Sequence, residues 1–502
     1  MNRIDNDLLS VQEARILVEN AREAQKALAA FPQEKLDEIV GRMAEAAFKY
    51  AKELALMSHE ETGFGKWQDK FVKNIFASDF LHKKIRDMKV VGIIGEDKAN
   101  KTMDIGVPVG VIVALPPSTN PASTTIYKAL IAIKAGNAIV FSPHPKARKT
   151  IATVLDILIR AAEESGLPSG AIGYLRTLAV DGTVALMNHK DTSLILITGV
   201  PKMVRAAYTS GKPTIYGGPG NGPAFIERSA DLKKAVADII ASRTFDNGIV
   251  SASEQSIVAE DCIAEEVRRE LRSKGAYFMS EEESVQLSKF FYRPDNSFNP
   301  EIVGRSALEL AQKSGLSVPE NTKVLISEQK YVSPTNPYSR EKLCPVLAFY
   351  VEKDWMNSCE KCIELLINDG RGHTLVIHSK NESVIREFAL KKPVSRVLVN
   401  TPASLGGIGA TTNLFPALTL GSGAAGGGFT SDNVTPMNLI NIRKVGYGVR
   451  LLEDIAKGVQ VGETTETSGS HCSANPPSID NTQDLKELLE KLMEQLKWYG
   501  DY

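Results

Sequence analysis

The spacing of apolar residues changes along the chain. Residues 7–60 carry apolar positions at helical spacing, first in LLSVQEARILVENAREAQKAL and again after FPQEK. From about residue 106, short apolar runs alternate with helical stretches, as in VGVIVAL, TTIYKALIAIKAG, NAIVFS and ARKTIATVLDILIRAAEESG. Because strands that alternate with helices build parallel sheets, this pattern predicts an α/β fold with helices on both faces of a mainly parallel sheet.

The alternation continues beyond residue 251 and predicts a second α/β segment. Its strand-like runs are SIVAE, KVLISE, PVLAFYV and TLVIHS, and AEEVRRELRSKG has helical periodicity. The end of the chain differs. Residues 451–481 are rich in Ser, Thr, Pro and Gly, which is typical of a flexible linker. Residues 482–502 contain one apolar helical stripe, formed by Leu485, Leu488, Leu489, Leu492, Met493 and Leu496.

Composition excludes several classes of protein. A chain of 502 residues suggests two or three domains, and 59 Lys+Arg against 60 Asp+Glu give a net charge of −1. No global charge favours nucleic acid or an anionic membrane as a partner. The sequence shows neither a signal peptide nor a spanning helix, and five cysteines do not form a disulfide framework. These features predict a cytoplasmic enzyme or binding protein.

Two strand-to-helix junctions are candidates for nucleotide binding. They are NAIVFSPHP at 137–145 and TGVPKMV at 198–204, since a strand that opens into a helix can bind a nucleotide at its carboxyl end. On spacing alone, either junction is also compatible with ordinary α/β connectivity. GSGAAG at 421–426 matches G-x-G-x-x-G but precedes no amphipathic helix, so we interpret it as a loop.

The candidate chemical side chains are few. FDNGIVSASEQS places Ser251 before a strand, with no histidine nearby in sequence to act as its base. Cys359 and Cys362 form C-x-x-C in a helical stretch without a second ligand pair, so no metal site is expected there. His373 precedes a strand and on its own indicates a structural residue. His471 and Cys472 lie in the linker and are interpreted as incidental.

Taken together, several motifs resemble the aldehyde dehydrogenase superfamily, and within it the CoA-acylating branch. That branch includes the aldehyde-oxidising half of bifunctional aldehyde–alcohol dehydrogenases. The resemblance runs from about residue 7 to 450 and rests on PSTNP, NAIVFSPHPKA, MVRAAYTSGKP, FDNGIVSASEQS, EKLCPVLA, GHT and NTPASLGGIG.

The resemblance implies a particular domain plan. It implies an aldehyde dehydrogenase fold, with a Rossmann-like NAD-binding domain, a second α/β catalytic domain and a β extension for oligomerisation. The corresponding ranges are 1–91 with 108–240 for the NAD-binding domain, 241–430 for the catalytic domain, and 92–107 with 431–450 for the oligomerisation strands. A homodimer or tetramer is expected.

The resemblance also explains what is unusual about Ser251. The family pattern has a cysteine here, which attacks the aldehyde, gives hydride to NAD and holds the acyl group as a thioester. A thiol ionises near pH ~8.5 and its thiolate is the nucleophile, whereas an unassisted hydroxyl stays protonated at neutral pH. Ser251 is therefore interpreted as a substitution, engineered or natural, that leaves the chain nearly inactive as written.

Other site residues follow from the resemblance position by position. Asn120 matches the oxyanion donor, and His373 matches a histidine near the acyl pocket. Glu341 matches the glutamate that binds the nicotinamide ribose. The remaining matched positions are Ser142 and His144 near the adenosine ribose, and Thr198 and Gly199 near the nicotinamide and pyrophosphate, followed by Val200 in place of a glycine.

One absence favours CoA as the acyl acceptor. Hydrolytic members carry a glutamate that activates water at the place where this chain reads YGGPGNG, 216–222, with Gly218. The expected reaction converts a short aldehyde, acetaldehyde first, with NAD and CoA to acyl-CoA and NADH. Propionaldehyde, sulfoacetaldehyde and succinate semialdehyde are alternative substrates. A hydrolytic dehydrogenase and a catalytically silent cargo or scaffold protein are the rival functions.

The final helix suggests a location. Some acylating members work inside bacterial microcompartments and carry a short amphipathic helix on a linker. Residues 482–502 are similar to such an encapsulation peptide, which implies a shell protein or a second cargo protein as partner. A helix packed on the oligomer is the alternative.

Overall fold

The computed structural model describes residues 5–293 and 298–457. These fall into two units, residues 1–447 and 448–502, and the described part of the second contains α17 (Leu452–Lys457). The predicted linker from 458 onward and the predicted helix at 482–502 lie outside the described residues. In the described part, no helix has both the length and the apolar character needed to cross a membrane.

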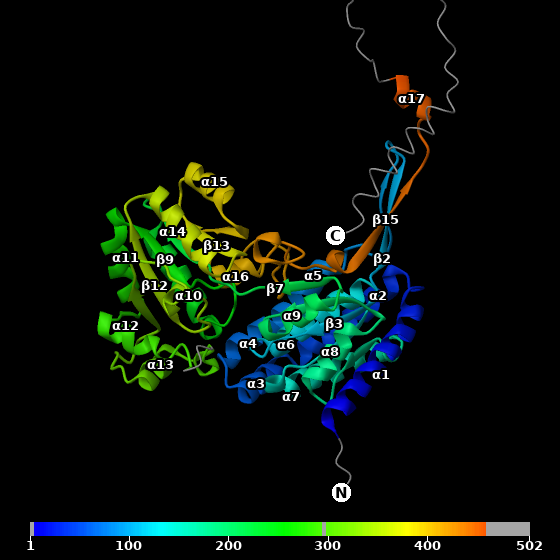
Figure 1. Ribbon diagram of the computed structural model, residues 1–502, viewed down its shortest axis with the longest axis horizontal. Helices are drawn as coiled ribbons and strands as arrows, with labels where there is room; N and C mark the ends of the chain where they lie inside the picture. The colour runs from blue at the N-terminus through cyan, green and yellow to red at the C-terminus, as the bar shows by residue number, and fades with distance from the viewer. Residues whose placement is uncertain (1–4, 294–297, 458–502) are drawn as a thin grey trace, which may run out of the picture. The chain divides into compact units, whose positions relative to one another are not determined.

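A five-stranded parallel sheet forms the first half of unit 1, in the order β5-β4-β3-β6-β7. Figure 1 labels β3 and β7 of this sheet. The chain starts at the central strand β3 and moves outward to β5. It then crosses back to β6 and β7, so that a topological switch point lies between β3 and β6. The strands are β3 (Val111–Leu115), β4 (Ala138–Phe141), β5 (Ile172–Tyr174), β6 (Thr192–Thr198) and β7 (Thr214–Gly217).

Helices cover both faces of this sheet. α6 and α7 pack with α2 on one face, while α8 packs with α1 and contacts α9. Every residue of α6 is buried, including the polar Ser123, Thr124, Thr125, Lys128 and Lys134. The elements are α1 (Asn6–Leu28), α2 (Gln33–Lys49), α3 (Ala51–Thr62), α4 (Trp67–Ile75), the π-helix η1 (Phe76–Phe80), α5 (Leu81–Ile85), α6 (Pro121–Lys134), η2 (Pro145–Ala147), α7 (Arg148–Glu164), α8 (Val180–Asn188) and α9 (Pro201–Thr209).

A seven-stranded parallel sheet forms the second half, in the order β10-β11-β12-β9-β8-β13-β14. Its strands are β8 (Pro223–Ile226), β9 (Ser256–Glu260), β10 (Ala276–Phe278), β11 (Val324–Glu328), β12 (Val346–Glu352), β13 (Gly372–His378) and β14 (Val394–Val399). The predicted second α/β segment is confirmed. The division between the two sheets falls between β7 and β8, earlier than the expected domain boundary at residue 240.

Helices flank the second sheet too. They are α10 (Leu232–Thr244), α11 (Asp261–Ser273), α12 (Glu281–Ser288), α13 (Ala307–Ser314), α14 (Trp355–Asn368), α15 (Glu382–Lys391) and α16 (Ala403–Gly407). Short 3-10 turns complete the chain, at η3 (Phe245–Gly248), η4 (Pro300–Ile302), η5 (Pro337–Ser339), η6 (Ala424–Gly426) and η7 (Pro436–Leu439). GSGAAG ends in η6 and opens no α-helix, which confirms its interpretation as a loop.

A small antiparallel sheet has the order β1-β2-β15. β1 (Gly92–Asp97) and β2 (Thr102–Pro108) form a hairpin, and β15 (Ile440–Gly446) pairs with β2 from the far end of unit 1 (Figure 1). Most of its side chains are exposed or half-buried. The ranges expected to form strands, 92–107 and 431–450, do contain them, and their role between subunits stays a prediction.

Candidate active site

A cavity of about 420 Å³ lies at the carboxyl ends of β3, β6 and β7, where the first sheet meets loops of the second. This is the edge at which open α/β sheets bind ligands. The cavity contains six of the predicted site residues, namely Asn120, Thr198, Gly199, Ser251, Glu341 and His373. The structure therefore brings together residues that are spread over more than half of the sequence.

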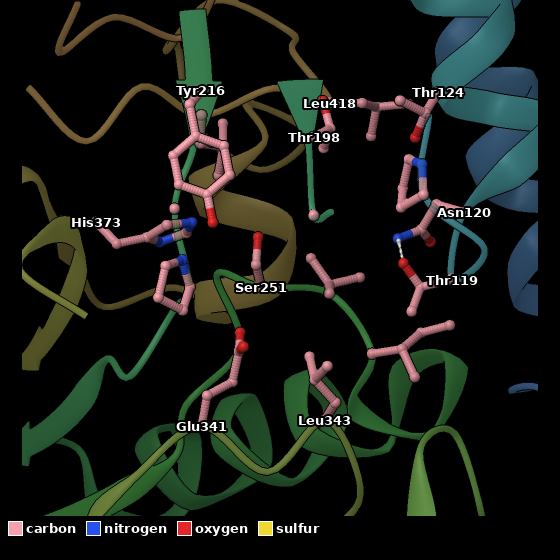
Figure 2. Close-up of a pocket in the computed structure, with 18 of the residues that line it drawn as sticks. Thr119, Asn120, Thr124, Thr198, Tyr216, Ser251, Glu341, Leu343, His373 and Leu418 are labelled. Atoms are coloured by element: carbon pink, nitrogen blue, oxygen red, sulfur yellow. Dashed lines mark hydrogen bonds between the residues drawn. The ribbon is translucent and has the colours of Figure 1, made fainter. Parts of the chain in front are cut away.

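Ser251 lies in the turn between η3 and β9, and its side chain is half-buried. In the view of Figure 2 it lies between His373 and Asn120. Its backbone carbonyl packs against Gly220 so closely that a Cβ on Gly220 would lie 1.7 Å from the oxygen. Among the described residues, neither ring nitrogen of His373 forms a hydrogen bond, so this histidine does not act as a base toward the Ser251 hydroxyl.

His373 reaches the cavity from β13 and is buried. Both ring nitrogens lack a hydrogen-bond partner among the described residues. Burial, with a smaller contribution from the positive charge of Arg396, lowers the pKa of His373 to about 3. The imidazole is therefore neutral at physiological pH. An unpartnered, neutral imidazole at a cavity wall can accept a hydrogen bond from a bound molecule.

Asn120 is the N-cap of α6, directly before Pro121. Its Nδ2 donates to Thr119 Oγ1 over 3.2 Å (Figure 2). Its Oδ1 accepts from Lys73 Nζ. Lys73 reaches the cavity from α4, and neither it nor its neighbour Lys70 was identified from the sequence.

Lys70 and Lys73 share one carboxylate, that of Asp246. All three side chains are buried, and Asp246 adopts a left-handed backbone conformation with φ of 47°. Burial alone would raise the pKa of Asp246, but the two ammonium groups outweigh this effect and lower it. Burial lowers the pKa of Lys70 to about 8. Two lysines and one aspartate give this cluster one excess positive charge if all are ionised.

Two carboxylates lie on the opposite wall. Glu341 Oε1 accepts from the backbone N–H of Gly220 over 2.9 Å, and Asp369 Oδ2 accepts from the backbone N–H of Glu341 over 3.1 Å. Burial, followed by repulsion from Asp369, raises the pKa of Glu341 to about 8. Glu341 is therefore mainly protonated at neutral pH, and it can donate as well as accept a hydrogen bond.

The positions predicted to bind a nucleotide divide into two groups. Thr198 Oγ1 and Thr419 Oγ1 lie 2.7 Å apart at the cavity, and Gly199 follows with φ of 59°. Ser142 and His144 do not line this cavity. They follow β4 at the same carboxyl edge, where Ser142 Oγ lies 2.7 Å from Thr183 Oγ1 and His144 Nδ1 accepts from Lys146 N.

This edge suits a dinucleotide. Gly199 has a positive φ and no side chain, so its backbone is accessible beside Pro117. An added Cβ would lie 3.3 Å from the proline side chain. The threonine and serine hydroxyls and the protonated Glu341 supply donors and acceptors along the switch point. Val200, which stands in place of a glycine, is the N-cap of α9 and packs against the core.

A metal site is not part of this arrangement. Within residues 5–293 and 298–457, no group of three or more His, Cys, Asp or Glu residues is placed to hold a metal ion. Cys359 and Cys362 are buried on α14, and Lys392 Nζ contacts Cys359 Sγ. His471 and Cys472 lie outside the described residues.

Comparison with known proteins decides the family. The family model described as "Aldehyde dehydrogenase family" matches residues 7–281, more than half of the chain. The chain belongs to the aldehyde dehydrogenase family. The fold expected from the resemblance, with parallel sheets and a small antiparallel sheet, is confirmed.

The curated relatives include an aldehyde-alcohol dehydrogenase and an enzyme whose name describes it as acetylating. The bifunctional aldehyde-alcohol dehydrogenase AdhE of Escherichia coli (strain K12) is 42% identical over 441 residues, covering 87% of this chain and 49% of that protein. This chain thus spans about half the length of that relative. The succinate-semialdehyde dehydrogenase (acetylating) of Clostridium kluyveri is 34% identical over 431 residues, covering 86% of this chain and 95% of that protein.

Solved structures of aldehyde dehydrogenases share the fold. An acetylating aldehyde dehydrogenase from Geobacillus thermoglucosidasius superposes with a TM-score of 0.87 at 46% identity, covering 90% of this chain and 99% of that one. A propionaldehyde dehydrogenase from the fucose utilisation bacterial microcompartment of Clostridium phytofermentans is more distant. Its TM-score is 0.79 at 28% identity, with 88% of this chain and 98% of that chain covered.

Proposed function

We propose that this fold catalyses the NAD- and CoA-dependent oxidation of a short aldehyde to an acyl-CoA, with acetaldehyde as the first-choice substrate. The proposal takes residue 251 as the nucleophile position, filled by cysteine in the competent enzyme. Support comes from the acetylating enzymes to which the chain is similar and from the residues that converge in the cavity.

CoA is proposed as the acyl acceptor because no residue described in the cavity lining offers a free carboxylate base. Position 218, where a water-activating glutamate would stand, is glycine. Among the described lining residues, the carboxylates are Glu341 and Asp369, and each accepts a hydrogen bond from a backbone N–H. A thioester at residue 251 would therefore persist until a thiol displaced it, and the thiol of CoA is the proposed acceptor.

The proposed reaction begins with a cysteine thiolate at position 251. It forms a C–S bond to the aldehyde carbon, and the carbonyl oxygen becomes an oxyanion. The Asn120 amide and the backbone N–H of residue 251 donate to this oxygen, and removing one such donor typically costs about 10²–10³ in kcat. Hydride must then leave the same carbon for a thioester to remain on residue 251, and NAD⁺, when bound, would supply the hydride acceptor. Ser142, His144, Thr198, Gly199 and Glu341 are proposed to hold that cofactor.

The second half of the reaction transfers the acyl group. His373 is proposed to accept a hydrogen bond from the CoA thiol as that thiol loses its proton to solvent, because its imidazole is neutral and has no described hydrogen-bond partner. The CoA sulfur then forms a bond to the acyl carbon, and the bond to residue 251 breaks. The balanced reaction is aldehyde, NAD⁺ and CoA to acyl-CoA, NADH and H⁺.

The substrate proposal rests on the cavity lining. Ile249, Leu343, Phe298 and Leu418 give an apolar surface that suits an uncharged short aldehyde. Of the cationic side chains in the lining, Lys73 is occupied by Asp246 and Asn120, and Arg340 lies over the Tyr292 ring. Propionaldehyde is the next choice. Sulfoacetaldehyde and succinate semialdehyde, which carry an anion, are less favoured.

A catalytically silent scaffold is the alternative of another class, and the observation that favours it is Ser251 itself. The hydroxyl has no described base, so the serine form is expected to bind NAD and CoA while turning over slowly. The intact arrangement of Asn120, Glu341 and His373 argues against a protein that never had activity.

We further propose a homodimer or tetramer assembled through β1, β2 and β15, and a cytoplasmic location inside a bacterial microcompartment. The encapsulation proposal is supported by the linker and stripe of residues 451–502 in the sequence. A shell protein or a second cargo protein would bind the stripe.

The test is Ser251→Cys, assayed for NADH formation with acetaldehyde, with and without CoA. We expect CoA-dependent NADH formation at least about 1,000-fold faster than in the serine form, because the nucleophile is restored. Ser251→Ala is the matched control and should resemble the serine form. NADH formation without CoA would support the hydrolytic rival. No activity with any of the four aldehydes would support the silent scaffold.

A further inference from the structure

The buried cluster of Lys70, Lys73 and Asp246 has an arrangement that core packing does not explain. Lys70 and Lys73 are one turn apart on α4, and both ammonium groups reach the same carboxylate. The second ammonium is not needed to neutralise Asp246, and burying an additional charge is costly. Lys70 and Lys73 differ in their contacts other than Asp246, and this difference suggests a function for Lys73.

Lys70 binds backbone. Its Nζ lies 3.1 Å from Asp246 Oδ2 and donates to the backbone carbonyl of Thr119 over 3.0 Å. Lys73 binds a side chain of the candidate site. Its Nζ contacts Asp246 Oδ2 and donates to the amide oxygen of Asn120. Lys73 also lines the cavity itself.

An ammonium group fixes the orientation of an amide. It has three donors and no acceptor, so the Asn120 oxygen must face Lys73 and the NH₂ group must face away from it. The rotated amide would place its NH₂ group against an NH₃⁺ group. One amide proton is directed to Thr119 Oγ1, and the other stays available on the cavity side.

We propose that Lys73 is the positioning residue that holds the Asn120 amide with its NH₂ group toward the substrate oxygen, while Asp246 anchors the ammonium. The inference rests on the proposed role of Asn120 as oxyanion donor. Lys73 acts through Asn120 and touches no reacting atom in this scheme.

The charge balance supplies a matched pair of variants. Lys73→Met leaves Lys70 paired with Asp246, one charge against one, and Lys70→Met leaves Lys73 paired with Asp246 in the same way. Both variants remove one buried ammonium from the same helix, but only Lys73→Met frees the Asn120 amide. Thermal melting and NAD binding check that both variants fold.

The measurement uses the Ser251→Cys protein and a 4-nitrophenyl ester of a short acid. The thiolate introduced at position 251 forms a bond to the acyl carbon and nitrophenolate leaves, so the burst of nitrophenolate reports oxyanion stabilisation without NAD, CoA or hydride transfer. We expect Asn120→Ala to slow the burst about 100-fold and Lys73→Met to slow it about tenfold or more, with little change in ester binding. Lys70→Met should slow it far less.

A double-mutant cycle decides the mechanism. If Lys73 acts through Asn120, adding Lys73→Met to Asn120→Ala should cause no further loss. Independent, multiplicative losses would overturn the proposal, as would equal losses in Lys70→Met and Lys73→Met. In another outcome, the aldehyde assay shows no activity while the burst still occurs and still depends on Lys73. That result would overturn the proposed oxidation but not the role of Lys73.

Discussion

The carboxyl group of Glu341 is held in an environment that favours its neutral form. Burial raises its pKa to about 8, well above the ordinary value of 4.5, and the unfolded chain regains the ordinary value. Between these two pH values the folded protein binds a proton that the unfolded chain has lost. The contribution of Glu341 to the free energy of unfolding is therefore lost as pH rises from about 4.5 to about 8.

Glu341→Gln should remove this pH dependence. The amide keeps an acceptor for Gly220 N–H and cannot ionise, so we expect the variant to gain stability relative to the parent as pH rises across that window. The difference is expected to reach on the order of a few kcal/mol and to level off above the folded pKa. Denaturant unfolding of both proteins at several pH values measures it. Parallel curves would show that Glu341 ionises normally in the folded state.

At the scale of residues, sequence reasoning worked where a motif marks the side chain. Asn120, Ser251, Glu341 and His373 come from four separate motifs, and the structure places them in one cavity. The placement of the Asp246 cluster could not be predicted in the same way. Lysines three residues apart in KWQDKFVKN are typical of a solvated helix face. Their carboxylate is supplied by a residue that is distant in sequence and has a left-handed backbone conformation.

At the scale of elements, α6 connects the strand edge to the site. Lys128 on this helix is fully buried, and its Nζ donates to the carbonyls of Leu115 and Leu196 over 2.8 Å each. These carbonyls lie in β3 and β6, the two strands that flank the switch point. Burial lowers the pKa of Lys128 well below its ordinary value. The amine thus links the helix to both strands at the base of the cavity.

Lys128→Met should destabilise the protein by about 1–3 kcal/mol, because it leaves two buried carbonyl groups without this donor. The control is Lys149→Met on α7, where the side chain is exposed, and it should have little effect. Chemical denaturation of the two variants compares them directly. Equal stability would mean that the two carbonyl groups find other donors.

The sequence was sufficient to predict several parallel strands, but not which strands they pair with. Buried parallel strands are short apolar runs, so VGVIVAL, SLILITG and TLVIHS could be recognised as strands. PAFI, which forms β8, has the same character. It joins the second sheet between β9 and β13, and four apolar residues contain nothing that selects one sheet over another.

At the scale of the whole molecule, the small β1-β2-β15 sheet is the expected contact between subunits. Its outer strands have no neighbour within the described chain, and unpaired strand edges are usually covered in native proteins. Ile93 and Ile442 are 49% and 44% exposed on these strands. Apolar side chains beside open edges suit burial against a second copy.

Ile442→Glu should shift the protein from a dimer or tetramer toward smaller species, because a buried, unpaired charge opposes association. Light scattering at micromolar concentration measures the change in mass. Leu390→Glu on α15, where the leucine is 81% exposed, is the control and should keep the parent assembly. A stable monomer in the parent protein would contradict the assembly proposed here.

The pairing of β15 with β2 also bears on how the chain folds as it is synthesised. Lys444 and Asp104, which form an ion pair across these strands, are 340 positions apart. While the ribosome is still making the residues between them, β2 has only β1 beside it and one open edge toward solvent. Such an edge can recruit a strand from another nascent chain. Synthesis that stalls between residues 399 and 440 is therefore expected to yield aggregates, even though the strands of both parallel sheets have already been made.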